Sequence, residues 1–211
     1  MEYKQLFETQ LKLDYRIKKE KALHGIPLTE NKILALLVEI GEMTNEWRGF
    51  KFWSNNQEPR TKLEYLCPSC DGTGFTYTTG GEHLQGFSEE TCEDCDGKGV
   101  LGEKNPLLEE YVDVLHFLLS IGNDIGYTTY TALKPTNEKM TVQKQILELY
   151  DFTAIFMNSL TFDEQVARDP YQELFNRFLN LGRLLGFTLE TIEEAYYNKN
   201  KINHERQDNG Y

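Results

Sequence analysis

Residues 39–53 read EIGEMTNEWRGFKFW, and this stretch carries the acids on which the predictions of fold and function depend. In a helix, Glu39, Glu42 and Glu46 lie on one face, because residues three and four apart are neighbours on its surface. Apolar residues border this acidic stripe, whereas a simple surface helix keeps one wide polar face. The apolar positions are Ile33, Leu36, Leu37, Ile40 and Trp47, with Leu34, Val38 and Met43 beside the acids. Taken alone, the stretch fits both a metal site and a solvated acidic face.

A second pair of acids, Glu110 and Asp113, lies in a helical pattern over residues 106–125. Apolar residues nearly surround the axis of this helix, which predicts that it is buried. Packed acids raise one another's pKa, and buried acids need compensating cations. Carboxylate oxygens suit hard ions such as Mg²⁺ or Mn²⁺. We therefore expect the two helices to lie side by side, with Glu39 and Glu42 facing the second pair across a divalent cation.

Composition narrows the class of protein. The chain has 211 residues, of which 39 % are hydrophobic and 27 % charged, as in an ordinary globular protein. Its 22 basic and 34 acidic residues give a net charge of −12, which disfavours broad electrostatic binding to nucleic acid. No segment approaches the ~18 to 20 consecutive apolar residues of a membrane span, and the N-terminus lacks a signal-peptide pattern. We expect a cytoplasmic protein that does not associate with membranes.

The remaining patterns are mostly helical, so the predicted fold class is all-α. The acidic helix is expected to start within residues 28–32, and its regularity ends at Gly49. Further helices are expected over residues 3–21, 140–160, 171–185 and 188–199, followed by a polar segment over 200–211. Thr29 and Thr188 are candidate N-caps. The predicted domains are a first part of the helical core over 1–54, an insert over 55–105, and a second part of the core over 106–211 with a C-terminal tail.

The insert contains an internal repeat of C-x-x-C-x-G-x-G. The first copy spans residues 67–74 and the second spans 92–99, and together they use all four cysteines, Cys67, Cys70, Cys92 and Cys95. Paired C-x-x-C knuckles predict a tetrahedral Zn²⁺ site, which is structural because four thiolates leave no open position. Disulfides are the alternative, but they are uncommon in the cytosol. The octapeptides are similar to the cysteine-rich repeats of DnaJ-type chaperones, and residues 76–81 suggest a short hairpin between them.

Two separated groups of residues resemble one family, the dimeric all-α dUTPases, which are relatives of the MazG-like nucleoside triphosphate pyrophosphatases. The first group is Glu39-x-x-Glu42, Trp47-Arg48-x-Phe50-Lys51-x-Trp53 and Glu110-x-x-Asp113, and the second is Lys199-x-x-x-Asn203-x-x-Arg206-Gln207-x-x-Gly210-Tyr211. The resemblance covers nearly all of the chain except the cysteine insert. It implies a helical bundle of the all-α NTP pyrophosphatase type, with the insert as a departure from the family pattern.

The resemblance also implies an activity and a set of site residues. The family hydrolyses dUTP to dUMP and pyrophosphate, accepts dUDP, limits uracil incorporation into DNA and works as a homodimer. The implied Mg²⁺ ligands are Glu39, Glu42, Glu110 and Asp113, and Glu39 or Glu42 would also orient the attacking water. The implied phosphate contacts are Lys199, Asn203, Arg206 and Tyr211, and the implied base contacts are Gln10, Trp53, His116 and Phe117. Asp14 stands where the family pocket uses an amide, so it is left out of this set.

Three alternatives stay open at this point. A related pyrophosphatase with another base preference, such as dCTP, would share the metal helices. A zinc-knuckle module on an inactive helical scaffold would bind a protein partner, and an active enzyme could recruit a partner through its insert. Without the resemblance, Lys199 and Arg206 would be read as solvated tail charges and His116 as a core histidine. We also expect the tail to be loose until nucleotide binds.

Overall fold

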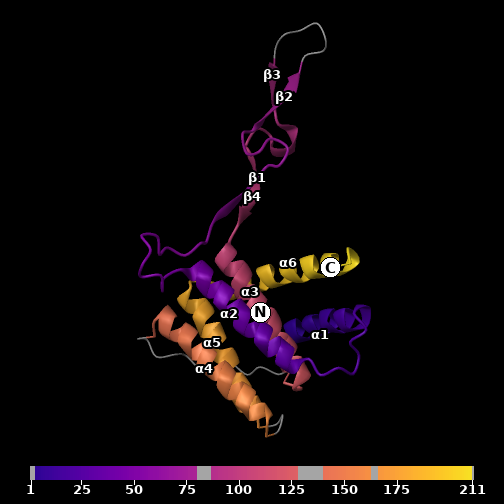
Figure 1. Cartoon of the computed structure of the whole chain (residues 1–211), viewed down its shortest axis with the longest axis vertical. Coiled ribbons are helices and arrows are strands. Elements are labelled where there is room, and N and C mark those ends of the chain that lie inside the picture. The colour runs from indigo at the N-terminus through magenta and orange to yellow at the C-terminus, as the bar shows by residue number, and fades with distance from the viewer. Residues whose placement is uncertain (1–2, 80–86, 128–139, 163–165, 211) are drawn as a thin grey trace. The chain divides into compact units, whose positions relative to one another are not determined.

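The computed structural model describes residues 3–79, 87–127, 140–162 and 166–210, and its contacts divide the chain into two units. The first, here the helical unit, contains residues 1–59 and 107–211. The second, here the cysteine unit, spans Arg60–Pro106. The described residues contain six α-helices, four short strands and one short 3₁₀ helix (Figure 1), so the prediction of an all-α fold with a small cysteine-rich insertion is confirmed.

The helical unit is a bundle built around α3. Its helices are α1 (Tyr3–Glu20), α2 (Thr29–Trp47), α3 (Pro106–Asp124), α4 (Val142–Leu160), α5 (Arg168–Leu184) and α6 (Leu189–Asp208). α4 packs along α5, α2 packs against α4, and α1 packs against α6. The apolar residues around α3 are almost fully buried, as the sequence pattern predicts, and include Leu107, Tyr111, Val114, Leu115, Leu118, Leu119 and Ile121. Such a helix is stable only at the centre of the core, and its few polar positions are therefore informative.

Two details of the helix ends differ from the sequence prediction. Thr29 is the first residue of α2 rather than its N-cap, and the cap position Leu28 makes no side-chain hydrogen bond. α6 continues to Asp208 instead of ending near Lys199, so most of the expected polar tail is helical. Thr188 caps α6 as predicted, accepting a hydrogen bond from the backbone N–H of Thr191.

The extension of α6 is stabilised from α1. Arg16 on α1 donates to the backbone carbonyl of His204 at 3.1 Å and to the Asp208 carboxylate at 2.5 Å. These contacts join positions 188 and 192 residues apart in the sequence, which local patterning cannot anticipate. The predicted polar segment from residue 200 is therefore helical up to Asp208; a change in its order on nucleotide binding stays a prediction.

The cysteine unit consists of two antiparallel strand pairs and the two knuckles. β1 (Leu63–Leu66) pairs with β4 (Val100–Lys104), and β2 (Phe75–Thr79) pairs with β3 (Phe87–Thr91). The second pair agrees with the predicted hairpin-like segment, whose connecting residues 80–86 lie outside the described part of the chain. A short 3₁₀ helix, η1 (Glu93–Cys95), forms the second knuckle.

The two knuckles hold each other through reciprocal backbone hydrogen bonds. The Cys67 N–H donates to the Gly99 carbonyl and the Cys92 N–H donates to the Gly74 carbonyl, both at 2.9 Å. A Cβ at Gly74 would lie 2.4 Å from the Gly97 carbonyl oxygen, and one at Gly99 would lie 2.3 Å from that of Gly72. Both positions also have positive φ, so each needs glycine for two reasons.

The described helices were also compared with the length and hydropathy of a membrane-spanning helix, and none of them meets both requirements.

Candidate active site

Three carboxylates from two helices meet in the helical unit. Glu39 and Glu42 come from α2 and Glu110 comes from α3, and each offers an oxygen within 4.8 Å of the other two. Burial raises the pKa of Glu39 to about 7, and neighbouring carboxylates add to the increase. Burial and neighbouring carboxylates likewise raise the pKa of Glu110 to about 7. Acids held this close repel one another, and a divalent cation is the compensation that oxygen ligands favour.

Asp113 lies beside this cluster but has a partner on α6. The Lys199 ammonium lies 2.5 Å from the Asp113 carboxylate, and both side chains are mostly buried. Burial raises the pKa of Asp113, while the hydrogen bond and charge of Lys199 and the charge of Arg206 oppose that increase. The ion pair brings a positive charge from α6 to the edge of the acid cluster.

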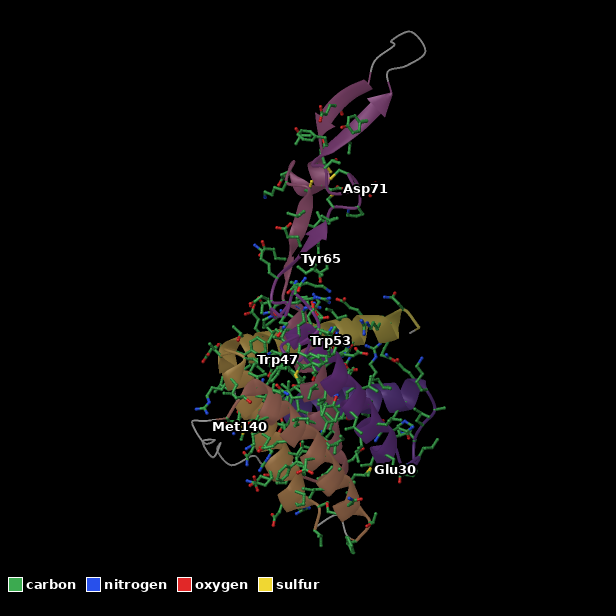
Figure 2. All side chains as sticks on the ribbon, turned by 60° about the vertical axis from the view of Figure 1, so that its left-hand side comes forward. Glu30, Trp47, Trp53, Tyr65, Asp71 and Met140 are labelled. Atoms are coloured by element: carbon green, nitrogen blue, oxygen red, sulfur yellow. The ribbon has the colours of Figure 1, made fainter. Side chains whose placement is uncertain are left out.

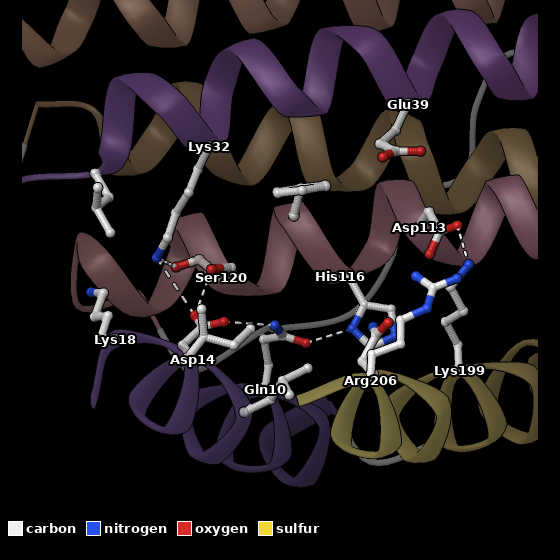
Figure 3. Close-up of a pocket in the computed structure, with 15 residues that line it drawn as sticks. Gln10, Asp14, Lys18, Lys32, Glu39, Asp113, His116, Ser120, Lys199 and Arg206 are labelled. Atoms are coloured by element: carbon white, nitrogen blue, oxygen red, sulfur yellow. Dashed lines mark hydrogen bonds and ion pairs between the residues drawn. The ribbon is translucent and has the colours of Figure 1, made fainter. Parts of the chain in front are cut away.

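A cavity of about 310 Å³ opens from this region within the helical unit. Figure 3 shows α2 and α3 along one side of it and α1 and α6 along the other. Glu39, Asp113 and Lys199 lie at one end, while Asp14 and Lys32 lie at the other. The cavity thus has an end suited to metal and phosphate chemistry and a second end lined by amide, hydroxyl and paired charged groups.

The predicted phosphate residues share one face of α6. Lys199, Asn203 and Arg206 all line the cavity, as expected for positions separated by four and three residues on a helix. Asn203 is partly buried and Arg206 is exposed. Tyr211, the fourth predicted phosphate contact, lies outside the described residues.

Of the predicted base contacts, three line the cavity and one does not. Gln10, His116 and Phe117 are lining residues, and the Nδ1 atom of His116 lies 2.7 Å from the Oε1 atom of Gln10. Trp53 follows α2, is 65 % exposed and packs edge-on against Phe52. Trp53 is not among the residues that line the cavity. Its position after α2 can be followed in Figure 2, which labels Trp53 and Trp47.

Residues that the sequence analysis did not assign also line the cavity. Asp14 accepts hydrogen bonds from Gln10 at 2.8 Å and from Ser120 at 2.5 Å. Lys32 lies 3.5 Å from Asp14 and 2.6 Å from Asp124. One signal was present in the sequence, because Gln10 and Asp14 stand four residues apart on the face of α1 that also buries Leu6 and Leu13.

The four cysteines form a second cluster, inside the cysteine unit. All are buried and unoxidised, and their sulfur atoms lie within 4.8 Å of one another. The Sγ–Sγ distance is 3.7 Å for Cys67–Cys92 and for Cys70–Cys95. The sulfur atoms gather beside Asp71 (Figure 2). Backbone N–H groups of Gly74 and Gly99 donate to the Cys70 and Cys95 sulfurs at 3.3 Å, which stabilises thiolate charge. Four converging sulfurs with such donors fit Zn²⁺ and do not form disulfides.

A comparison with protein families agrees with this geometry. A family model described as dUTPase matches residues 2–93 and 98–211. The chain belongs to the dUTPase family. It is therefore an enzyme that hydrolyses dUTP, and its family indicates dependence on a divalent metal ion. No curated protein matches the chain.

Proposed function

We propose that the helical unit is a Mg²⁺-dependent dUTP diphosphatase that releases dUMP and pyrophosphate and also accepts dUDP. The observation that carries this proposal is the convergence of Glu39, Glu42 and Glu110 at the end of a cavity that also presents Lys199 and Arg206. Cleavage of a phosphoanhydride needs positioned reactants and neutralised phosphate oxygens, and this end of the cavity offers groups for both.

The roles of the acids follow from their surroundings. Glu39, Glu42 and Glu110 would hold Mg²⁺, with Asp113 as a fourth ligand when Lys199 turns toward phosphate. The bound ion would neutralise charge on the phosphate oxygens and help to activate water. Glu39 lines the cavity, so it is placed to orient that water.

The remaining lining residues would bind the nucleotide. Lys199, Asn203 and Arg206 would contact the phosphates from α6, and Tyr211 would add a contact from the end of the chain. Gln10, His116 and Phe117 would contact the base at the inner part of the cavity. Trp53 would have to move from its exposed position to stack on the base, which makes it the weakest member of the proposed set.

A pyrophosphate-release assay tests the proposal. dUTP, dCTP, dATP, dGTP and dTTP are each supplied with Mg²⁺ and then with a chelator. We expect release from dUTP that the chelator abolishes. The proposal fails if dUTP is not turned over, or if turnover is the same without a divalent cation.

The cysteine unit has a separate proposed role. We propose that Cys67, Cys70, Cys92 and Cys95 bind one structural Zn²⁺ and that the insert, with boundaries near residues 55 and 105, is a module added to the enzyme. A protein partner for it stays a prediction, tested by comparing proteins captured by the full chain and by a chain without the insert. Identical captures would exclude a recruiting role.

The oligomeric state, which the family resemblance implies, and the location in the cell are also proposals. We propose that the enzyme is a homodimer, which light scattering of the purified chain at several concentrations would test. A monomer mass throughout would contradict it. We also propose a cytoplasmic location, where the four thiols stay reduced and available to Zn²⁺.

A further inference from the structure

Asp113 on α3 is held by a cation from α6. The Lys199 ammonium lies 2.5 Å from the Oδ2 atom of Asp113, and the two side chains are 20 % and 17 % exposed. Figure 3 shows Lys199 reaching from α6 to Asp113, with Glu39 of α2 nearby. The acid cluster, which is Glu39, Glu42 and Glu110, has oxygens within 4.8 Å of one another, and it does not include Asp113. Asp113 therefore lies beside the proposed metal site with its charge already compensated.

Lys199 compensates the neighbouring acids as well as Asp113. Burial is the main cause that raises the pKa of Glu39, Glu110 and Asp113, and neighbouring carboxylates add to the increase. The positive charge of Lys199 opposes the increase at each of these three residues. Its ammonium thus supplies part of the neutralisation that clustered carboxylates otherwise obtain from a divalent cation.

The same ammonium faces the proposed phosphate site. Lys199 lines the cavity together with Asn203 and Arg206, on the face of α6 that the proposed function assigns to the phosphates. An ammonium group is a compact charge, so contact with a phosphate draws it away from Asp113. That movement would leave a mostly buried carboxylate unpaired, which is costly unless another cation replaces the lysine. Phosphate should therefore bind well only when a second cation takes over Asp113.

A divalent cation meets the same constraint from the other side. It cannot use Asp113 as a ligand while the Lys199 ammonium occupies that carboxylate, because two cations at one carboxylate repel each other. Phosphate oxygens remove this obstacle when they accept the ammonium. Each ligand therefore prepares the site for the other, and the coupling between them is reciprocal.

We propose that Lys199 exchanges Asp113 for phosphate, and that this exchange couples binding of the nucleotide to binding of the divalent cation. Asp113 becomes a metal ligand only in the complex that contains both. The inference rests on the proposed function, because it takes the cavity to be the nucleotide site. The acid cluster binds the cation in either state, whereas Asp113 strengthens that binding only when nucleotide is present.

The first test measures Mn²⁺ binding to the full chain without nucleotide, by electron paramagnetic resonance of the free ion. The double variant Lys199→Met/Asp113→Asn removes the ion pair as a neutral unit. Its dissociation constant for Mn²⁺ should stay within about threefold of the wild-type value, since Asp113 is not yet a ligand. Lys199→Met alone should bind Mn²⁺ about tenfold more tightly, because it frees Asp113 for the ion. Lys201→Met, whose side chain is 78 % exposed on α6, is the matched control and should bind like the wild type.

The second test measures the coupling itself by calorimetry. The α,β-imido analogue of dUTP, which is not hydrolysed, is titrated into the full chain with saturating Mg²⁺ and then with a chelator. The ratio of the two dissociation constants reports the coupling, and chelation of Mg²⁺ by the analogue contributes equally for every variant. Lys199→Met/Asp113→Asn should lower the ratio by about tenfold. A lysine that only contacts phosphate would weaken binding equally in both conditions and keep the ratio.

The outcomes separate this inference from the proposed function. An enzyme that hydrolyses dUTP but whose double variant keeps the wild-type ratio overturns the inference alone. So does a double variant that loses Mn²⁺ binding without nucleotide, because Asp113 would then be a ligand from the start. An unchanged Mn²⁺ affinity in Lys199→Met, which keeps Asp113, contradicts it as well. A wild-type chain that binds the analogue in neither condition overturns the proposed function, and the inference with it.

Discussion

The acid cluster and the cysteine cluster are both suited to hold a metal ion, but they differ in how they are built. The four cysteines come from two copies of one octapeptide, are all buried, and have backbone N–H donors at two of the sulfurs. The acids come from two helices distant in sequence, and Glu42 is exposed. A closed, satisfied site favours a structural role, whereas an open and mutually repelling site favours catalysis.

The largest expected effect is a loss of activity, without a loss of stability, when one acid of the cluster is replaced. Glu110→Gln should lower kcat/KM for dUTP by ~10³-fold or more, since it removes a proposed metal ligand. The melting temperature of the metal-free chain should stay the same or rise, because one repelling charge is gone. Pyrophosphate release and thermal unfolding measure the two effects. Glu30→Gln, at an exposed position on α2, serves as control. Near-normal activity of the Glu110 variant would exclude it as a ligand.

Replacing a ligand of the cysteine cluster should instead reduce stability and leave activity intact. Cys67→Ser should abolish stoichiometric Zn²⁺ binding and unfold the cysteine unit, since a closed zinc site contributes on the order of 10 kcal/mol to the folding of a small module. The acid cluster belongs to the other unit, so dUTP hydrolysis should persist. Metal analysis and amide hydrogen exchange over β1 and β4 report the loss. Tyr77→Phe, at an exposed position of β2, should keep the ion. Full Zn²⁺ retention by Cys67→Ser would contradict the proposed ligand set.

The next largest effect is a pH dependence confined to the acid cluster. Glu39 and Glu110 have a pKa of about 7 in the folded chain, above the ordinary value of 4.5. A raised pKa means that the folded state binds more protons than the unfolded state between these values. The stability they contribute is complete below about pH 4.5 and is lost as the pH rises through about 7.

Thermal unfolding of the metal-free chain should reveal this loss. The melting temperature should fall as the pH rises from 5 to 7.5, and saturating Mg²⁺ should remove most of the decrease, because the cation compensates the ionised acids. The variant Glu39→Gln should show a shallower pH dependence. A metal-free melting temperature that rises across this window would contradict the assignment.

The smallest effect concerns the anchoring of α6. Arg16→Met removes the hydrogen bonds to His204 and Asp208, so amide exchange near the end of α6 should accelerate. KM for dUTP should rise by about fivefold at most, the scale of one exposed ion pair, with kcat nearly unchanged. Lys12→Met, at an exposed position on α1, is the control. Unchanged exchange in the Arg16 variant would show that α6 holds its end without α1.

Local spacing explains why much of this molecule can be predicted from its sequence. Glu39 and Glu42 are three residues apart, which places them on the same face of a helix. Apolar residues on all sides of α3 identify it as the buried helix. The C-x-x-C repeat specifies its cluster through residues that are close in the chain. Each of these features depends on a period that the sequence displays directly.

Features that depend on contacts between distant residues could not be predicted in the same way. α6 extends to Asp208 because Arg16 on another helix holds its end, and no nearby residue signals this. The surroundings of Gln10 combine Asp14, Ser120 and Lys32 from three helices. Asp14 carries a carboxylate where the family resemblance implies an amide, and its contacts with Ser120 and Lys32 come from helices that only the fold brings together.

The reciprocal backbone bonds between the two knuckles have a consequence for engineering. The Cys67 N–H donates to the Gly99 carbonyl and the Cys92 N–H donates to the Gly74 carbonyl, so the two knuckles stabilise each other directly. The segment between β2 and β3 is not needed for these two hydrogen bonds. Lengthening the hairpin should therefore be tolerated, since each doubling of a flexible loop costs only about 0.6 kcal/mol. A peptide tag inserted between Thr79 and Phe87 should thus leave Zn²⁺ binding by the four cysteines unchanged.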